Sequence, residues 1–147
     1  MLLEFNLQPI PKQSVRQGRS QSGKVIFYQD SKYKKYAKSL LEEFKTQVPP
    51  GFLPFSGPLE VVITYIFPVL SSMSKKDKDL ISSGGYILKT TKPDIIDNLN
   101  KAFFDTFEKV LYNNDSQISA FSARKLYGQA PKIILNIQEI PNRYIYP

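Results

Sequence analysis

The chain of 147 residues contains no cysteine and no histidine. The missing thiols exclude disulfide bonds and thiolate metal sites, and the missing imidazoles exclude histidine as a metal ligand, general base or catalytic dyad member. Hydrolytic chemistry in this protein must therefore use carboxylates, lysines, tyrosines or a bound metal ion. The metal-ligating side chains that remain are carboxylates, whose hard oxygen atoms favour magnesium or manganese. We therefore expect any metal ion bound by this chain to be one of these two.

The sequence also lacks a long hydrophobic run, since no stretch approaches the roughly 18 apolar residues that cross a membrane. We therefore expect a soluble protein with no membrane partner. The first apolar residues are interrupted by Glu4 and follow no basic region, which a signal peptide would require. This pattern favours a strand over an export signal, so we expect a cytoplasmic protein.

Positive charge and core-forming residues are abundant. Lys and Arg total 20 against 13 Asp and Glu, which gives a net charge of +7. This excess favours a polyanionic partner through counterion release, although many basic proteins bind no nucleic acid. Hydrophobic residues make up 41% of the chain, with nine tyrosines and ten phenylalanines. At this length we expect residues 1–147 to form a single domain around one core.

Apolar periodicity predicts an α+β (α/β) fold, with a single mixed sheet of about five strands and two main helices packed on it. Alternating apolar residues predict strands at 2–7, 25–28, 116–127 and 132–140. Residues 59–67 are apolar at nearly every position, which predicts a central strand covered on both faces.

Helical spacing predicts one helix from Asp30 or Ser31 to just before Pro49, and a second from Pro93 to the turn at 113–114. Two stretches show no core-forming period. Residues 12–24 and 71–92 are rich in lysine, arginine, serine and glycine, which predicts exposed basic loops.

Three aspartates and a lysine surround the second predicted helix. Asp94, Asp97 and Lys101 lie at its start, and Asp115 lies in the turn beyond its far end. Carboxylates held together repel one another, and a divalent cation offsets that repulsion while it polarises a phosphate and lowers the pKa of a bound water. Lys101, one turn after Asp97, would stabilise charge on the phosphoryl group beside the positive helix N-terminus. A helix of roughly 15 residues spans about 22 Å, so Asp115 reaches Asp94 only if the next strand returns beside the helix start or the helix ends early.

The same residues have a purely structural interpretation. Asp94 suits a helix N-cap, and Asp97 suits the first helical turn, where the helix dipole favours negative charge. Asp97, Lys101 and Asp105 follow one another at four-residue spacing, which suits ion pairs along one exposed helix face. Asp115 is an ordinary turn residue. Under this alternative the chain is a non-catalytic nucleic-acid-binding module, or an interaction protein whose basic face docks an acidic partner.

Four segments, in order along the chain, resemble the RusA family of Holliday junction resolvases, the crossover junction endodeoxyribonucleases common in phages and prophages. They are PKQSVR, FYQDSKYKKYAK, SKKDKDLISSGG and KPDIIDNLNKAFFDTFEKVLYNNDSQI. The resemblance implies a homodimer that binds four-way DNA junctions and uses Mg²⁺ or Mn²⁺ to nick two strands symmetrically. It also implies a phage or prophage origin and action in the cytoplasm of a bacterial host.

By the same resemblance, four residues are catalytic and three of them ligate the metal. The catalytic residues are Asp94, Asp97, Lys101 and Asp115, and the three aspartates are the ligands. Asn114 stands where a second acidic residue is usual in the family.

The spacing of the first two aspartates departs from the family pattern. The family separates them by one residue, whereas Ile95 and Ile96 both intervene between Asp94 and Asp97. In an extended segment the extra residue would turn one carboxylate to the opposite face, but a helical first turn keeps both on one face. We therefore expect an early helix start, or a bulge, to bring Asp94 beside Asp97.

The basic residues of the two predicted loops are the expected DNA contacts. They should bind phosphates rather than read bases, so binding should weaken steeply with salt. These residues are Arg16, Arg19, Lys24, Lys75, Lys76, Lys78, Lys89 and Lys92. Phe27, Tyr28 and Tyr86 are candidates for stacking on unpaired bases at a junction centre, although the first two also fit a strand.

Overall fold

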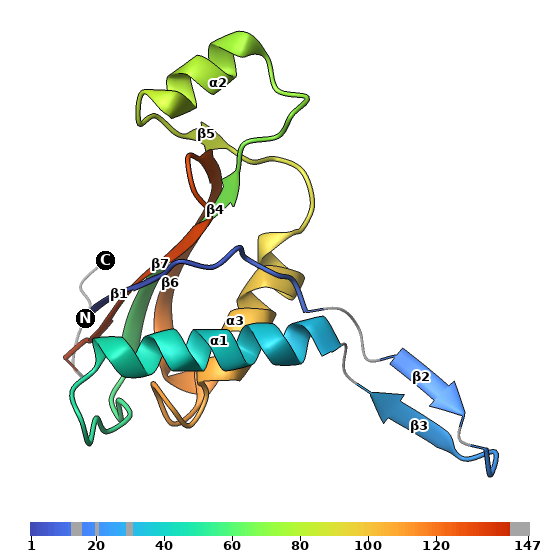
Figure 1. Ribbon diagram of the computed structural model, residues 1–147. Coiled ribbons are helices and arrows are strands. Elements are labelled where there is room, and N and C mark those ends of the chain that lie inside the picture. Colours follow the sequence, from blue (N-terminus) through green and yellow to red (C-terminus); the bar gives the residue numbers. More distant parts are fainter. Residues whose placement is uncertain (13–15, 20, 29–30, 142–147) are drawn as a thin grey trace.

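The computed structural model describes residues 1–12, 16–19, 21–28 and 31–141 and has a mixed sheet with helices packed on it (Figure 1). The sheet has five strands in the order β1-β7-β4-β6-β5. This arrangement confirms the predicted α+β fold. Within the described part of the chain, no helix combines the length and the apolarity needed to cross a membrane. The strands are β1 (Leu2–Phe5), β4 (Leu59–Pro68), β5 (Ile87–Leu88), β6 (Ile118–Gly128) and β7 (Lys132–Glu139).

Strand β4 is central, as its sequence predicts. It pairs parallel with β6 on one side and antiparallel with β7 on the other, so that Ile63 lies between Ala123 and Leu135. Residues 63–67 are buried throughout, whereas Glu60 and Val62 are half-buried. The prediction of a strand covered on both faces therefore holds for its second half.

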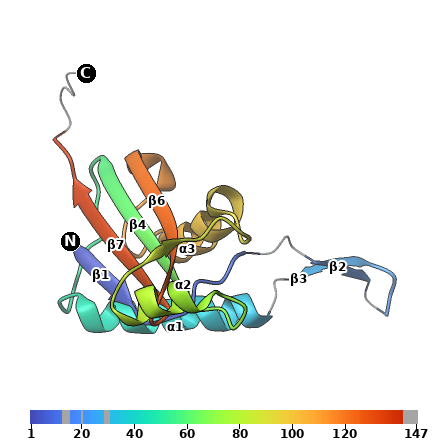
Figure 2. The same ribbon diagram turned by 90° about the horizontal axis from the view of Figure 1, so that it is seen from above.

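Helices α1 (Ser31–Gln47) and α3 (Asn100–Phe107) pack against each other, and α1 also contacts β1 (Figure 2). The ring of Phe103 lies at their junction with the sheet. It is fully buried, and its centroid is 4.7 Å from Phe107, 5.6 Å from Phe5 and 6.5 Å from Tyr65. Aromatic pairs at these distances add about 0.5–1.5 kcal/mol each beyond the area they bury. This cluster fixes α3, and with it the residues that precede it, against the sheet.

The predicted loop at 12–24 contains a strand instead. Strand β2 (Arg16–Arg19) pairs antiparallel with β3 (Val25–Tyr28), and the hairpin projects away from the main sheet (Figures 1 and 2). The sequence RQGR of β2 carries no apolar alternation because the hairpin does not pack on the core. Strand β3 was predicted correctly.

The predicted loop at 71–92 is also partly ordered. It contains helix α2 (Lys75–Ser82), capped by the Ser74 hydroxyl, which accepts from the backbone N–H of Asp77 at 3.1 Å. Ile81 is the one buried residue of this helix, so the sequence shows almost no helical period. The two-residue strand β5 then pairs with β6.

The second predicted helix ends earlier than its apolar pattern indicates. Helix α3 stops at Phe107, Glu108 has an extended backbone, and Lys109 has a positive φ of 68°. Leu111 and Tyr112 are nonetheless fully buried. The apolar period therefore continues past the helix because a turn, and not another helical turn, covers the core there.

Candidate active site at the start of helix α3

Asp94 caps the helix that carries the predicted catalytic residues. Its Oδ1 accepts hydrogen bonds from the backbone N–H groups of Asp97 at 2.9 Å and Asn98 at 3.1 Å, and its Oδ2 accepts one from the Asn98 side-chain amide. The Asp97 N–H, followed by the Asn98 amide, holds the pKa of Asp94 below its ordinary value. This capping contribution to stability is present above the ordinary aspartate pKa and is lost as pH falls through the lowered value. Asp94 is thus the N-cap that the structural interpretation predicts.

The first turn after Asp94 is a π-helix, η1 (Ile95–Leu99). The N–H of Leu99 donates to the Asp94 carbonyl at 3.2 Å, and the N–H of Asn100 donates to the Ile95 carbonyl, so both bonds span five residues. A π-turn holds one residue more than an α-turn. The helix therefore begins directly after Asp94, as expected, and the extra isoleucine is absorbed by a wider turn while Ile96 stays 82% exposed.

Two hollows lie beside this turn. The first, of about 430 Å³, contains Asp94 and Lys92, and the second, of about 350 Å³, contains Asp97 and Lys101. Lys12 and Asn98 line both hollows. The chain thus brings Asp94, Asp97 and Lys101 to one helix end, with a carboxylate and an ammonium in each hollow.

The sheet holds this helix end from two sides. Asn100, which is 8% exposed, accepts a hydrogen bond at 3.0 Å from the buried Tyr65 hydroxyl of β4. From β6, the Lys125 ammonium donates to the carbonyl oxygens of Thr91 and Pro93, just before Asp94. These contacts fix the backbone on each side of the π-turn, which limits the movement of the residues that carry the Asp94 and Asp97 carboxylates.

Lys89, expected to contact phosphate, is buried instead. It is 9% exposed, and its ammonium donates to Thr91 Oγ1 at 2.7 Å and to the Tyr127 hydroxyl at 2.8 Å. It also lies 5.1 Å from the centre of the Phe67 ring. Although burial alone would raise the pKa of Tyr127, the hydrogen bonds from Lys89 and Thr91 bring it below its ordinary value. The Lys89 side chain therefore has its partners inside the fold, which corrects the expectation of a surface contact.

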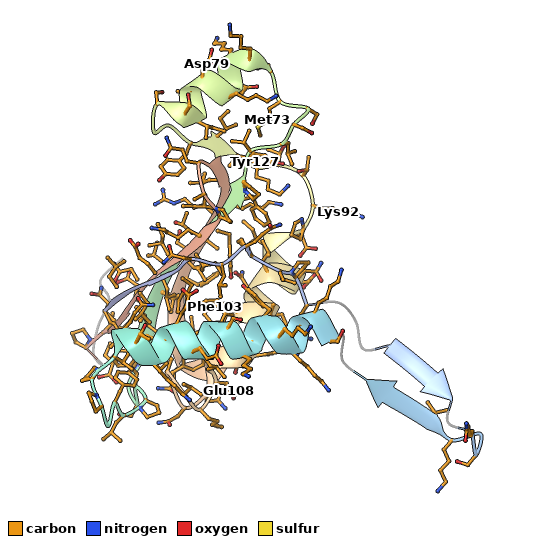
Figure 3. All side chains as sticks on the ribbon, in the orientation of Figure 1. Met73, Asp79, Lys92, Phe103, Glu108 and Tyr127 are labelled. Atoms are coloured by element: carbon orange, nitrogen blue, oxygen red, sulfur yellow. The ribbon has the colours of Figure 1, made fainter. Side chains whose placement is uncertain are left out.

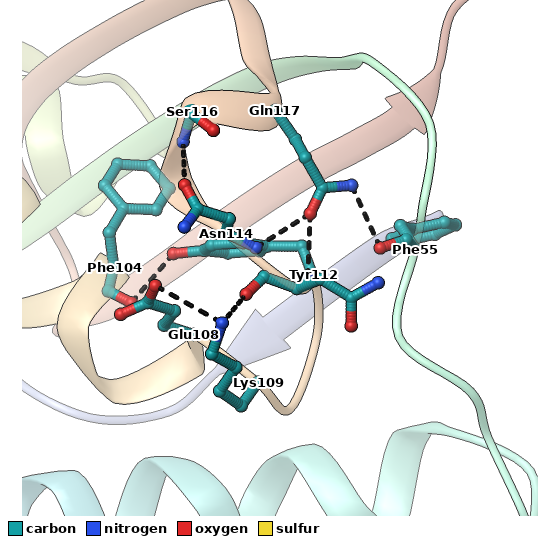
Figure 4. Close-up of polar contacts among 9 residues, drawn as sticks. Phe55, Phe104, Glu108, Lys109, Tyr112, Asn114, Ser116 and Gln117 are labelled. Atoms are coloured by element: carbon teal, nitrogen blue, oxygen red, sulfur yellow. Dashed lines mark hydrogen bonds and ion pairs between the residues drawn. The ribbon is translucent and has the colours of Figure 1, made fainter.

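Asp115 begins the short 3₁₀ helix η2 (Asp115–Gln117) at the other end of α3. Gln117 stabilises this turn, because its amide donates to the Phe55 carbonyl oxygen at 3.1 Å (Figure 4). The same amide donates to the Gly57 carbonyl oxygen at 2.9 Å. The Asn114 side chain caps η2 and leaves Asp115 exposed. This network fixes the turn that carries Asp115, which follows α3 in the chain.

Asp115 acts on Tyr112 together with two acidic residues at the end of α3. Burial raises the pKa of Tyr112, and the charges of Asp115, Glu108 and Asp105 raise it further. Asp105 follows Asp97 by eight residues, about 12 Å along a helix. Among the described residues, no three acidic side chains are close enough to hold one metal ion. One copy of the chain therefore groups Asp94 with Asp97 but does not bring Asp115 to them.

The remaining expected DNA contacts are spread over three places. Lys75 and Lys76 are exposed at the start of α2, and Lys24 is exposed at the tip of the hairpin. Lys78 donates to the Ser71 carbonyl at 2.6 Å. Lys92 projects from the loop before the helix, beside the first hollow (Figure 3).

Some predicted contacts fall outside the described side chains. These are Arg16, Arg19, Phe27 and Tyr28, of which the structure describes the backbone. Tyr86, the third stacking candidate, is 56% exposed. Stacking on a base stays a prediction for all three aromatic residues.

Lys12 is a residue of this site that the sequence did not single out. The segment PKQSVR that contains it resembles a recurring family segment, and this was the available signal. Nothing in the sequence indicates that Lys12 meets the helix start, because more than 80 residues separate it from Asp94.

The chain is similar to known proteins over most of its length. Residues 6–138 match the family model of endodeoxyribonuclease RusA. The chain is also 28% identical to the uncharacterized protein YqaN of Bacillus subtilis (strain 168) over 131 residues, which cover 88% of this chain and 87% of that protein. The family match includes the complete segment from Lys12 to Asp115 and therefore both ends of α3.

Proposed function

The chain belongs to the RusA family of endodeoxyribonucleases, and from this premise we propose that it resolves four-way DNA junctions by metal-dependent paired nicking. Family membership implies endonuclease action on Holliday junctions. The observation that carries the finer proposal is the pairing of Asp94 and Asp97 on one helix turn, with Lys101 in the same hollow as Asp97.

The donor set at the π-turn fits a magnesium or manganese ion. Mg²⁺ is commonly held by one or two protein carboxylates, with waters and substrate phosphates completing its shell. A carboxylate has about four acceptor positions, and the capping hydrogen bonds use three of those of Asp94. Asp94 therefore has room for one bond to a cation, and Asp97 supplies the second carboxylate. The lowered pKa of Asp94 keeps it ionised, as a metal ligand must be.

When bound, such an ion would polarise the scissile phosphate and lower the pKa of a water. The chain's own groups orient the substrate around it. Lys101 lies one turn after Asp97, so its ammonium offsets the negative charge that grows on the phosphate. The helix N-terminus points its partial positive charge at the same place.

Paired nicking requires two active sites, which a homodimer would supply. A two-fold dimer places two equivalent sites against the two-fold symmetric arms of a junction. Asp94, Asp97 and Asp115 of one copy do not form a group that could hold one ion together, so we assign Asp115 to the site of the second copy. Each complete site would then combine Asp94, Asp97 and Lys101 of one copy with Asp115 of the other.

A cleavage assay on labelled DNA tests the proposed function directly. We expect the protein to cut a four-way junction at symmetric positions in Mg²⁺ or Mn²⁺ and to leave a linear duplex of the same sequence uncut. Cleavage should stop in EDTA. Binding to the junction without cleavage in either metal would contradict the proposal and favour a non-catalytic binding module.

Replacing Asp94 by asparagine separates its two roles. Asparagine caps helices as well as aspartate does, so we expect Asp94→Asn to keep the wild-type melting temperature. A lost metal ligand should lower junction cleavage by about 100-fold, the upper end of effects seen for groups that support a metal site.

Asp94→Ala is the matched comparison, because it removes the cap as well as the ligand. It should lower both the melting temperature and the cleavage rate. Full activity of Asp94→Asn together with a weak Asp94→Ala would show that Asp94 acts through helix capping alone.

A further inference from the structure

Lys12 stands between the two hollows beside the π-turn. Its backbone N–H donates to the Asn98 carbonyl at 3.1 Å, which ties the N-terminal segment to the helix start. Its side chain lines the hollow of Asp94 and also the hollow of Asp97. No other lysine in the described part of the chain lines both.

The two hollows repeat the same set of groups. Each has one aspartate and one lysine of its own, Asp94 with Lys92 and Asp97 with Lys101. Lys12 lines both hollows. The lysines repeated in the two hollows suit a repeated anion, and successive phosphates of one DNA strand are such a ligand.

The Lys12 ammonium has a partner within the protein. It forms an ion pair with Asp105, and it lies 5.3 Å from the centre of the Tyr33 ring. The Lys12 side chain is 18% exposed, and that of Asp105 is 40% exposed. Water reaches the Asp105 side of this pair and screens its attraction to Lys12, so a phosphate can compete with Asp105 for the ammonium.

We propose that Lys12 is a phosphate-binding residue of the active site. Its ammonium leaves Asp105 and binds phosphates of the substrate strand where that strand crosses from one hollow to the other. This inference rests on the proposed function, because it takes DNA as the substrate. In the free protein the Lys12 ammonium is held by Asp105, which follows Lys101 by one helical turn. On binding, the ammonium contacts the phosphates next to Asp94 and Asp97.

The test measures junction binding in EDTA as a function of salt for single and double variants. Lys12→Gln should weaken binding and reduce the slope of log affinity against log salt by about 1, the value for one lost phosphate contact. Lys12→Arg keeps the charge and should keep the wild-type slope. Asp105→Asn removes the competitor, so binding should become several-fold tighter.

The double variant and a surface control complete the design. In the Lys12→Gln background, Asp105→Asn should no longer tighten binding, since the two changes act on one contact. Lys38→Gln removes the same charge from the solvent face of α1, where Lys38 is 79% exposed beside Glu42, and should leave the slope unchanged.

A purely structural ion pair predicts a different set of results. Both single variants would then lower the melting temperature, neither would change the salt slope, and Asp105→Asn would weaken binding. An unchanged slope for Lys12→Gln in a protein that cleaves junctions would overturn this inference alone. A changed slope in a protein that cleaves no junction in any metal would support the role of Lys12 and contradict the proposed function.

Discussion

Asp97→Asn should abolish junction cleavage and leave junction binding intact or tighter. Asp97 is exposed in the second hollow beside Lys101, and its side chain has no capping role. A bound metal ion contributes several kcal/mol to stabilising the transition state, so its loss should lower the rate by at least about a thousandfold. Binding is spared because removing a negative charge reduces repulsion of the phosphates. Single-turnover cleavage rates and affinities in EDTA measure the two effects separately.

Asp79→Asn is the matched control for this variant. Asp79 is exposed on α2, so the same change in charge and shape is made away from the π-turn (Figure 3). Its cleavage rate should equal that of the wild type. If Asp97→Asn lost binding together with cleavage, its role would be structural, and if it cleaved normally, the assignment of Asp97 as a ligand would be wrong.

Mixing two inactive variants should restore nicking. Asp97→Asn and Asp115→Asn should each be inactive alone, but a mixed dimer has one site in which both aspartates are intact. With random exchange of copies, half of the dimers are mixed, so about a quarter of all sites should recover. A mixed dimer has one working site, so its product should be a junction with one nick rather than two resolved duplexes. Gel separation of nicked and resolved products distinguishes these outcomes.

The control for mixing uses two residues of the same helix turn. Asp94→Asn and Asp97→Asn damage the same half of each site, so their mixture should show no recovery beyond the activity that Asp94→Asn has alone. If the mixture of Asp97→Asn and Asp115→Asn also stayed inactive, while a size tag on one variant showed that copies exchange, Asp115 would not complete the site of the second copy.

The sequence allowed the main strands and the first helix to be predicted because their residues face the core. In β4 and β7 the apolar pattern follows directly from burial, as for Ile133, Leu135 and Ile137. Strand β2 and helix α2 could not be predicted, because their sequences lack the apolar pattern of core-facing elements. Strand β2 belongs to the hairpin that projects from the main sheet (Figure 1), and α2 has one buried residue, so neither a period of two nor one of 3.6 appears in their sequences.

The site was predictable along the helix but not across the fold. Asp94, Asp97 and Lys101 are neighbours in sequence, so helical geometry alone brings them together. Lys12 reaches them only through long-range packing, which no local pattern reveals. Lys89 shows the same limit, since its polar sequence neighbours gave no sign that Phe67 and Tyr127 would enclose it.

The early end of α3 also could not be derived from the apolar pattern. The buried Leu111 and Tyr112 continue the helical period although the backbone has already turned at Lys109. The positions of Asp105 and Asp115 depend on that turn. Their relation to the π-turn therefore became clear only from the three-dimensional arrangement.

The most direct test of the metal site is anomalous diffraction from crystals of the protein soaked in Mn²⁺. We predict an anomalous peak at the π-turn, with carboxylate oxygens of Asp97 and Asp94 about 2.0–2.6 Å away, the range of magnesium to calcium ligands. A saturating soak that placed no manganese beside Asp97 in any copy would contradict the proposal that this helix end is a metal-dependent nuclease centre.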